Sequence, residues 1–427
     1  MKYKLCSILF FAIFYFSVTC PSIAQSTGDL DKTFGNSGKM NAGITGYYDV
    51  AESMALQRDG KIVVVGYGKE SPTSYKGLSM ARYLKNGEMD YDFGNYGIIH
   101  RLTRDLEGEA NSVVIQIDDK IVVVGYSISP ATNSEEITVV RFTIDGNVDK
   151  SFGDNGFIVT EISSEKDIGE GVVIQPDNKI VVVGTTHHKP TTDIVLIRYD
   201  EDGSLDYSFG IGGIVITDIK SSLDIGKAVA IQKDGKIVVS GFTHVVNKFF
   251  MTLVRYNSNG DLDPTFGNSG IVITEINGRR GKMDMVIQKD GKIILAGPSE
   301  VENSHHFTLL RFNNNGSLDK SFGKNGVTKT VIGDHSEAES VAIDLNGNIV
   351  VAGTTELGNE AFAVAMYDQN GRLVPDYGSG GIVKTSFIKN GVDRAHSVVI
   401  DYDGNIIVAG ETKNGYTTFG LVRFIGK

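Results

Sequence analysis

Seven positions, one in each of seven repeated segments, bring together side chains that can do chemistry. Three are glutamates, Glu52, Glu170 and Glu339, whose carboxylate oxygens are ligands that Ca²⁺ and Mg²⁺ prefer. His396 adds a group that titrates near neutral pH. Each position stands four residues before an aligned Leu or Ile, where the first strand of its segment is expected to begin. The full set is Glu52, Asn111, Glu170, Lys227, Met283, Glu339 and His396.

If the segments form a ring, these positions surround the mouth of a central channel. One hypothesis is a ligand site made of Glu52, Asn111, Glu170, Lys227, Glu339 and His396, in which Glu52, Glu170 and Glu339 hold a Ca²⁺ or Mg²⁺ ion. The other hypothesis is a solvated polar rim that binds nothing. We assign no catalytic residue, because the common hydrolase, zinc-protease and dinucleotide-binding signatures are absent from the sequence.

A second group of candidate ligands lies in loops that differ from segment to segment. These histidines could bind a transition metal if the loops converge, although adjacent histidines in an extended chain point in opposite directions. Loops that repeat almost unchanged serve a shared structural task, whereas loops that diverge can make specific contacts. The face with the divergent loops is therefore the candidate binding face for a protein or glycan. Its histidines are His187, His188, His244, His305 and His306.

Two sequence motifs recur through almost the whole chain. The first, Leu-Asp-x-x-Phe-Gly, begins at Leu30 and returns at steps of 59, 59, 57, 57, 56 and 55 residues. The second has the form Ile-Gln-x-Asp-Gly-Lys-Ile-Val-Val-Val-Gly. Repeats of this length leave no room for another domain, so one domain is expected over residues 25–427. The second motif ends at Gly66, Gly125, Gly184, Gly241, Gly297, Gly353 and Gly410.

Each repeat is expected to contain four short antiparallel strands. Runs such as 228–232 and 236–240 are short and β-branched, with no 3.6-residue apolar stripe, and Asp234-Gly235 between them is typical of a tight hairpin. Because one such sheet cannot cover both of its apolar faces, the repeats must stack. The sequence therefore predicts an all-β fold, a seven-bladed β-propeller of four-stranded antiparallel blades. A linear β-solenoid is the alternative, but its coils are shorter and its strands parallel.

The two ends of the chain are expected to share the last blade. The chain begins with an outer strand, within residues 30–45, and ends with the other three strands, within residues 395–424. A composite blade of this kind removes the exposed sheet edges that promote aggregation.

A recurring Arg and Asp, eight residues apart, predict buried ion pairs. In the sixth repeat both are replaced together, by Met366 and Val374. Joint loss is expected of a buried pair, because removing one partner leaves an uncompensated charge. The pairs are Arg82 with Asp90, Arg141 with Asp149, Arg198 with Asp206, Arg255 with Asp263, and Arg311 with Asp319.

The two motifs resemble those of the delta-60 repeat proteins, which are secreted bacterial propeller-like chains. The resemblance covers residues 28–427, and the strand order also resembles that of NHL propellers, in which an Asp-Gly hairpin joins the innermost strand to the second. The resemblance implies a propeller fold and export, but no established activity.

Charge and hydropathy exclude two classes of partner. The 427-residue chain has 41 Lys and Arg against 52 Asp and Glu, a net charge of −11, and no Lys/Arg-rich run, so it lacks the basic surface that binds nucleic acid. No segment approaches 20 consecutive apolar residues, so we expect no transmembrane segment.

The N-terminus has the features of a secretory signal peptide. Lys2 and Lys4 precede an apolar run over residues 5–18, and small residues predict cleavage after Ala24, so residues 1–24 are the expected leader. Both cysteines fall in it, and lipidation at Cys20 is not expected because Thr19 stands where lipoprotein signals have Gly, Ala or Ser.

We therefore expect a secreted or cell-surface monomer that acts as a binding or scaffolding module. The alternatives are a metal-dependent hydrolase or lyase with its site at the channel mouth, and a glycan-binding lectin.

Overall fold

The computed structural model describes residues 25–100, 107–220, 223–278, 281–301, 304–356, 359–389 and 391–426. The expected signal peptide, residues 1–24 with Cys20, lies outside this part of the chain. The described residues form strands, bridges and turns, without a helix. It follows that no helix in these ranges is long and apolar enough to cross a membrane.

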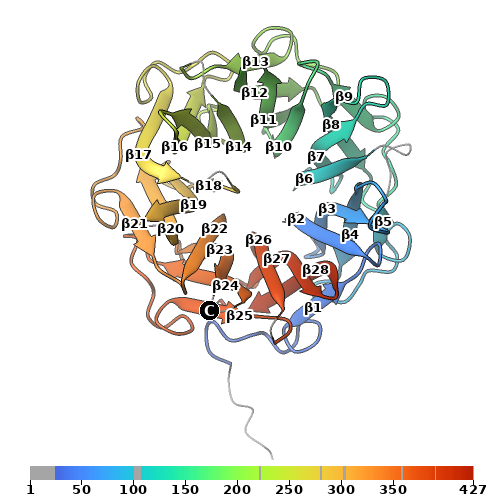
Figure 1. Cartoon of the computed structure of the whole chain (residues 1–427), viewed down its shortest axis with the longest axis vertical. Coiled ribbons are helices and arrows are strands. Elements are labelled where there is room, and N and C mark those ends of the chain that lie inside the picture. Colours follow the sequence, from blue (N-terminus) through green and yellow to red (C-terminus); the bar gives the residue numbers. More distant parts are fainter. Residues whose placement is uncertain are drawn as a thin grey trace, which may run out of the picture.

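The strands recur in groups of four along the chain, and we sort them by their position in the group as innermost, second, third and outer strands. The innermost strands, which surround the centre of the ring in Figure 1, are β2 (Tyr48–Leu56), β6 (Gly108–Ile115), β10 (Asp167–Ile174), β14 (Asp224–Ile231), β18 (Asp284–Ile287), β22 (His335–Ile343) and β26 (Val392–Ile400). The second strands are β3 (Ile62–Lys69), β7 (Ile121–Ile128), β11 (Ile180–His188), β15 (Ile237–Val245), β19 (Ile293–Val301), β23 (Ile349–Glu356) and β27 (Ile406–Asn414). The third strands are β4 (Gly77–Tyr83), β8 (Glu135–Phe142), β12 (Thr191–Tyr199), β16 (Lys248–Tyr256), β20 (Ser304–Phe312), β24 (Glu360–Tyr367) and β28 (Tyr416–Phe424). The outer strands are β1 (Lys39–Ala42), β5 (Ile98–His100), β9 (Phe157–Thr160), β13 (Ile214–Thr217), β17 (Ile271–Gly278), β21 (Val327–Thr330) and β25 (Ile382–Thr385).

Strands that follow one another in the chain pair antiparallel, from the inner to the outer strand of each unit. Two further contacts, Tyr48 with Thr417 and Gly278 with Ser299, join neighbouring units, so that the structure has both four-stranded and eight-stranded sheets. The 28 described strands fit units of four. We number these units in chain order, the first being β2–β5 and the last β26–β28 with β1.

Tight turns connect each inner strand to the second strand as the sequence predicts, and in four of the units the turn is Asp-Gly. In the fourth unit Gly235 has φ 82°, a conformation that glycine adopts without strain. The amide of Gln232 donates to the Lys236 carbonyl at 2.8 Å across this turn. We call the side with these turns the hairpin face, and the opposite side, where the second strand leads to the third, the loop face.

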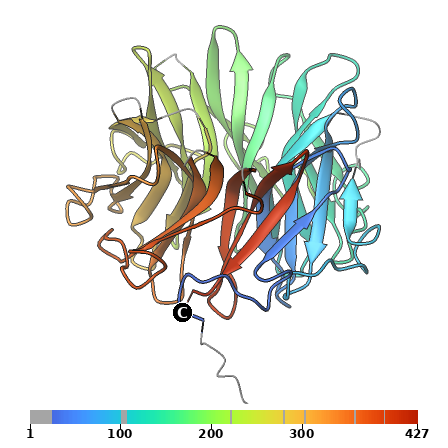
Figure 2. The ribbon, with the colours of Figure 1, turned by 60° about the horizontal axis from the view of Figure 1, so that its bottom comes forward.

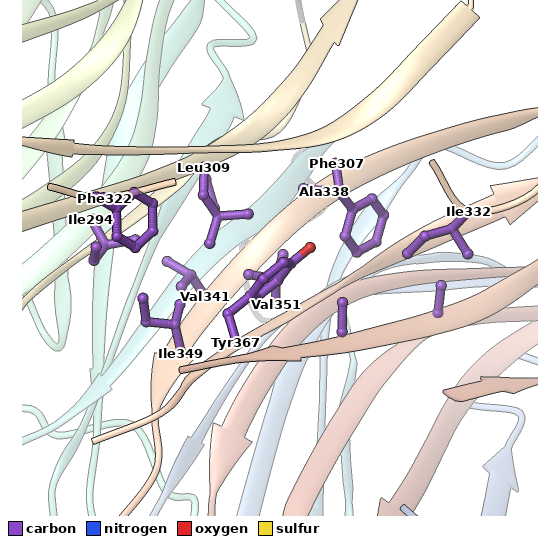
Figure 3. Close-up of a cluster of buried hydrophobic side chains, with 13 residues drawn as sticks. Ile294, Phe307, Leu309, Phe322, Ile332, Ala338, Val341, Ile349, Val351 and Tyr367 are labelled. Atoms are coloured by element: carbon purple, nitrogen blue, oxygen red, sulfur yellow. The ribbon is translucent and has the colours of Figure 1, made fainter. Parts of the chain in front are cut away.

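The hydrophobic core lies between the units. The cluster in Figure 3 packs Phe307, Leu309 and Phe322 of the fifth unit against Val351 and Tyr367 of the sixth, and these side chains are completely buried. Burying such a side chain contributes about 1.5–3 kcal/mol. Each unit is therefore stabilised by its neighbours on both sides.

The N-terminal and C-terminal segments share one sheet, as predicted. β1 pairs antiparallel with β28, from Lys39 opposite Val422 to Ala42 opposite Phe419. The amide of Gly28 also donates to the Ile425 carbonyl at 2.7 Å. In Figure 2 the N-terminal segment, in blue, runs beside the C-terminal strands, in red.

The predicted Arg–Asp pairs are confirmed, and each does more than join two charges. In all six Arg–Asp pairs, the one in the closing unit included, the distance from Arg Nε to Asp Oδ2 is 2.6–2.8 Å. Each guanidinium also lies 4.3–4.7 Å from the centre of a buried Phe ring. Each Arg also donates through Nη1 to a backbone carbonyl of the next unit. The closing unit has the pair as well, formed between Arg423 and Asp31 from opposite ends of the chain.

Candidate functional site

Six of the seven predicted channel positions occupy the same unusual place in the backbone. The inner strands begin earlier than the sequence indicated, so that these residues are the fourth or fifth of their strands rather than the first. The pairing register shifts at each of them, which marks a β-bulge, an extra residue without a partner on the second strand. The bulged residues are Glu52, Asn111, Glu170, Lys227, Glu339 and His396.

The bulge explains why the second motif ends in glycine. The inner strand bends toward the second strand at the bulge, and a Cβ on Gly241 would lie 1.9 Å from the Ile225 carbonyl oxygen. Equivalent Cβ atoms on Gly66, Gly125, Gly184, Gly353 and Gly410 would lie 1.8–2.2 Å from a carbonyl oxygen. The glycine alone does not predict the bulge, because Gly297 holds the same position in the fifth unit, which has no bulge.

The bulged residues line one central cavity of about 250 Å³, and they bond to one another in pairs. Lys227 Nζ lies 2.6 Å from Glu170 Oε1, and His396 Nδ1 lies 2.5 Å from Glu339 Oε2. Asn111 donates through Nδ2 to the Gly169 carbonyl at 2.8 Å. Each of these contacts joins two adjacent units across the wall of the channel.

The fifth unit is the exception, because β18 has no bulge. Without the extra residue, the alternation of the strand turns Met283 into the core, where it is 4% exposed. Lys282, which sequence analysis missed, lines the cavity instead and forms an ion pair with Glu52 of the first unit. Its Nζ also donates to the Glu52 carbonyl at 2.9 Å. The inner strands of the two units are not neighbours in the ring of Figure 1, so this ion pair spans the channel.

A second ring of polar groups lies next to the bulges. The carboxylate of Asp284 accepts bonds from the Ser340 hydroxyl and the Val341 amide, both at 3.0 Å. The Ser397 hydroxyl in turn accepts from the Met54 amide at 3.2 Å. These buried bonds tie the inner strands to one another, and they suit a structural role.

The pKa values of the groups in the channel are consistent with these ion pairs and with burial. Burial alone would raise the pKa of Glu52, but Lys282, His396 and Lys227 together hold it below its ordinary value. Burial lowers the pKa of His396, whereas Glu339 and Glu52 raise it by more, so its net pKa is raised and the imidazolium is favoured. Asp284 has a raised pKa because of burial.

The structure thus brings the six predicted ligand-binding residues to one cavity, but it gives each glutamate a different cation as partner. Glu52, Glu170 and Glu339 do not form a group of metal-ligand atoms within 4.8 Å of one another. The Ca²⁺ or Mg²⁺ site at the channel mouth remains a prediction. An ion bound there would have to displace Lys282, Lys227 or His396.

A larger pocket opens beside the channel on the loop face, with a volume of about 490 Å³. Arg394 Nη2 donates to Glu360 Oε1 at 2.9 Å, and Arg394 Nη1 to Glu411 Oε1 at 3.1 Å. His305 Nδ1 lies 3.4 Å from Glu337 Oε1. We call this the loop-face pocket; it is lined by His305, His335, Ser336, Glu337, Glu339, Thr354, Glu356, Glu360, Arg394 and His396.

Only part of the predicted histidine group is in this pocket. His305 lines it, and its ring centre lies 5.5 Å from that of His335, which the sequence did not single out. His244 instead packs on Phe249. No three histidines in the described ranges come within metal-ligand distance of one another.

Comparison with known proteins supports the fold. Six segments match the model of a family described as "Domain of unknown function (DUF5122) beta-propeller"; they are residues 57–93, 116–152, 175–209, 232–266, 288–322 and 403–424. A search of the curated proteins finds no match.

Two solved structures are similar to the chain as a whole. One is a catalytically inactive virginiamycin B lyase from Staphylococcus aureus with quinupristin, at 12% identity and a TM-score of 0.50, with 90% of this chain and 98% of that chain covered. The other is a polysaccharide lyase of family PL25, an ulvan lyase, at 10% identity and a TM-score of 0.50, with 91% and 96% covered. At these identities the likeness is one of fold alone. The chain is therefore built from β-propeller repeats.

Proposed function

We propose that this protein is an exported, seven-bladed propeller of the delta-60 repeat type, and that it acts as a binding module through its loop face. The difference between the two faces supports this proposal. On the hairpin face the recurring charges are used within the structure: Arg198 pairs with Asp206 of its own unit and donates to the Ser258 carbonyl of the next. On the loop face the loops differ from unit to unit, and the loop-face pocket, which is lined by residues of β20, β22, β23, β24 and β26, opens there.

The observation that carries the proposal is the chemistry of this pocket. Its walls come from the fifth, sixth and seventh units and present four glutamates, one arginine and three histidines, of which His396 favours the imidazolium and pairs with Glu339. Arg394 is already bonded to Glu360, whereas the exposed Glu356 projects from the end of β23. Carboxylates accept bonds from hydroxyl and ammonium groups. A hydroxyl-rich or cationic ligand, such as a glycan with amino sugars, suits this surface.

Binding of chitosan oligosaccharides, neutral glycans and spermidine to residues 25–427, measured by calorimetry, tests the proposal. We expect at least one of these probes to bind, and Glu356→Gln and Glu337→Gln to weaken that binding. Glu201→Gln is the matched control, because Glu201 is an exposed acid in a turn of the hairpin face. Binding by none of the probes, or equal binding by all variants, would contradict the role of the pocket.

A specific observation favours a second candidate, an enzyme of the hydrolase or lyase class. The Glu339–His396 pair lies between the central cavity and the loop-face pocket, and its side chains are only 10% and 11% exposed. The raised pKa of His396 suits a general acid. Ulvan and quinupristin are the first substrates to assay, because the two similar structures are an ulvan lyase and a lyase with quinupristin. Turnover that His396→Asn abolishes would establish the enzyme, and binding without turnover would favour the module.

Export and ring closure are separate parts of the proposal. Intact mass measurement of protein recovered outside the cell should show a chain that starts at Gln25.

Deletion of residues 25–45 should leave β28 without its partner β1 and produce oligomers by edge pairing. A monomer with unchanged heat stability after this deletion would contradict the closed ring.

A further inference from the structure

Three aspartates from the third and fourth units meet close to the loop face. Asp193 is in β12, Asp218 directly follows β13, and Asp224 is the first residue of β14. One carboxylate oxygen of each lies within 4.8 Å of those of the other two. Among the described residues this is the one group of three or more His, Cys, Asp or Glu side chains with such spacing.

The spacing matches what one hard cation needs. Oxygens that bind the same Ca²⁺ at about 2.4 Å can be at most about 5 Å apart, and Ca²⁺ takes carboxylate oxygens readily. Asp193 and Asp224 are 5% and 0% exposed, whereas Asp218 is exposed. The group therefore has a buried floor and an opening to solvent through which an ion can enter.

The repeats contain an internal control for Asp224. Asp49, Asp167 and Asp393 hold the same position in their units and are also buried. In each, one oxygen accepts from a backbone amide of the preceding loop, and the other accepts from a threonine hydroxyl: Thr45 at 2.7 Å for Asp49, Thr186 at 2.6 Å for Asp167, and Thr412 for Asp393. These aspartates clamp a loop with both oxygens satisfied.

Asp224 departs from this pattern in one oxygen. Its Oδ2 accepts from the Ile219 amide at 2.6 Å, as in the other units. Thr243 stands opposite it on β15 and its hydroxyl lowers the pKa of Asp224, but no hydrogen bond of ordinary length reaches the buried Oδ1. A buried carboxylate oxygen left without a partner costs free energy, which a bound cation would recover.

The electrostatic surroundings agree with this reading. Burial raises the pKa of Asp224 to about 7; the Ile219 amide and the Thr243 hydroxyl lower it, and the charges of Asp218 and Asp193 contribute to the rise. A divalent cation at the centre of three carboxylates would nearly balance their charge. We propose that Asp193, Asp218 and Asp224 bind a hard divalent cation, and that Ca²⁺ fits them best.

The test uses residues 25–427, stripped with EDTA and dialysed, with Ca²⁺ or Mg²⁺ as the probe. Calorimetry should show one site for Ca²⁺, and the melting temperature should rise by several degrees at about 10 mM Ca²⁺. Asp218→Asn should weaken binding at least about tenfold without lowering the metal-free melting temperature, because Asp218 is exposed. Asp193→Asn and Asp224→Asn should also abolish the rise.

Two controls separate this site from others. Asp167→Asn removes the equivalent clamp of the third unit and should lower the metal-free melting temperature while keeping the Ca²⁺ response. Glu52→Gln should keep that response as well, which distinguishes the aspartates from the central cavity. Absence of binding at about 10 mM of either ion, or a response that survives Asp218→Asn and Asp193→Asn, would overturn the proposal.

Discussion

The fourth and fifth units are neighbours with the same sequence motif, yet their inner strands differ. β14 has eight residues and a bulge at Lys227, whereas β18 has four residues and no bulge. A Cβ on Gly241 would lie 1.9 Å from the Ile225 carbonyl oxygen, but one on Gly297 would first meet the flexible end of Met251, at 3.2 Å. The same glycine is thus indispensable in one unit and replaceable in the next.

This comparison shows that the bulge decides which side chain faces the channel. In the fourth unit the bulge directs Lys227 to a neighbour, Glu170. The fifth unit has no bulge, and there Lys282 faces the channel and forms an ion pair with Glu52 of the first unit. The motif alone does not distinguish the two outcomes.

The largest expected effect comes from adding a methyl group to each of the two glycines. Gly241→Ala should lower the free energy of unfolding by about 3–4 kcal/mol, because the bulge carbonyl has to move. Gly297→Ala should cost less than about 1 kcal/mol, since a methionine side chain can rotate away. Urea denaturation of both variants measures the difference; equal losses would mean that the bulge does not impose the glycine.

The sixth unit offers a comparison of the same kind, because Met366 and Val374 replace the ion pair there. Asp206→Val alone should destabilise the protein by about 3 kcal/mol, since it leaves Arg198 buried without its carboxylate. Adding Arg198→Met should recover much of this loss, although the bond from Arg198 to the Ser258 carbonyl also disappears. Additive losses in the double-mutant cycle would show that the two residues do not interact.

Replacing either of the two lysines in the channel, Lys282 or Lys227, should destabilise the protein by a similar and smaller amount. Lys282→Met and Lys227→Met each leave a poorly exposed glutamate without its nearest cation, at a cost of about 2 kcal/mol. Glu52→Gln should remove most of the cost of Lys282→Met but none of the cost of Lys227→Met. If Glu52→Gln rescues neither variant, the ion pair across the channel does not form in solution.

The smallest effect concerns pH. Because the folded state raises the pKa of His396, its ion pair with Glu339 stabilises the protein fully below about pH 6.5, and this stability is lost as the pH rises through the folded pKa. The free energy difference between wild type and His396→Gln should therefore shrink between about pH 6 and pH 9. His306 is the control of opposite sign, since burial lowers its pKa, and its contribution is lost as the pH falls. A difference for His396→Gln that does not vary with pH would show that the pair does not depend on the imidazolium.

The sequence predicted the repeated strands and the Arg–Asp pairs, because each rests on a local pattern that occurs many times, and it predicted the pairing of the chain ends because the chain begins with an outer strand and ends with a third. It also placed six residues around one channel. It missed the bulges, because an extra residue in a strand leaves no mark in the alternation until the partner strand is known. It missed Lys282 and the cluster of Asp193, Asp218 and Asp224 for a related reason: each depends on a departure from the repeat and on contacts between different units, which the motif does not show.

The pairing of β1 with β28 also has a consequence for the order of folding. Arg423 and Asp31 are separated by 392 positions, so their contact closes almost the longest loop that the chain can make. Contacts of such long range form slowly, because the chain loses much of its freedom before the contact stabilises it. The units in between can pack onto one another before β1 pairs with β28. A chain interrupted before residue 416 would never supply that partner, so β1, the first strand made, can be placed only after β28 has been synthesised.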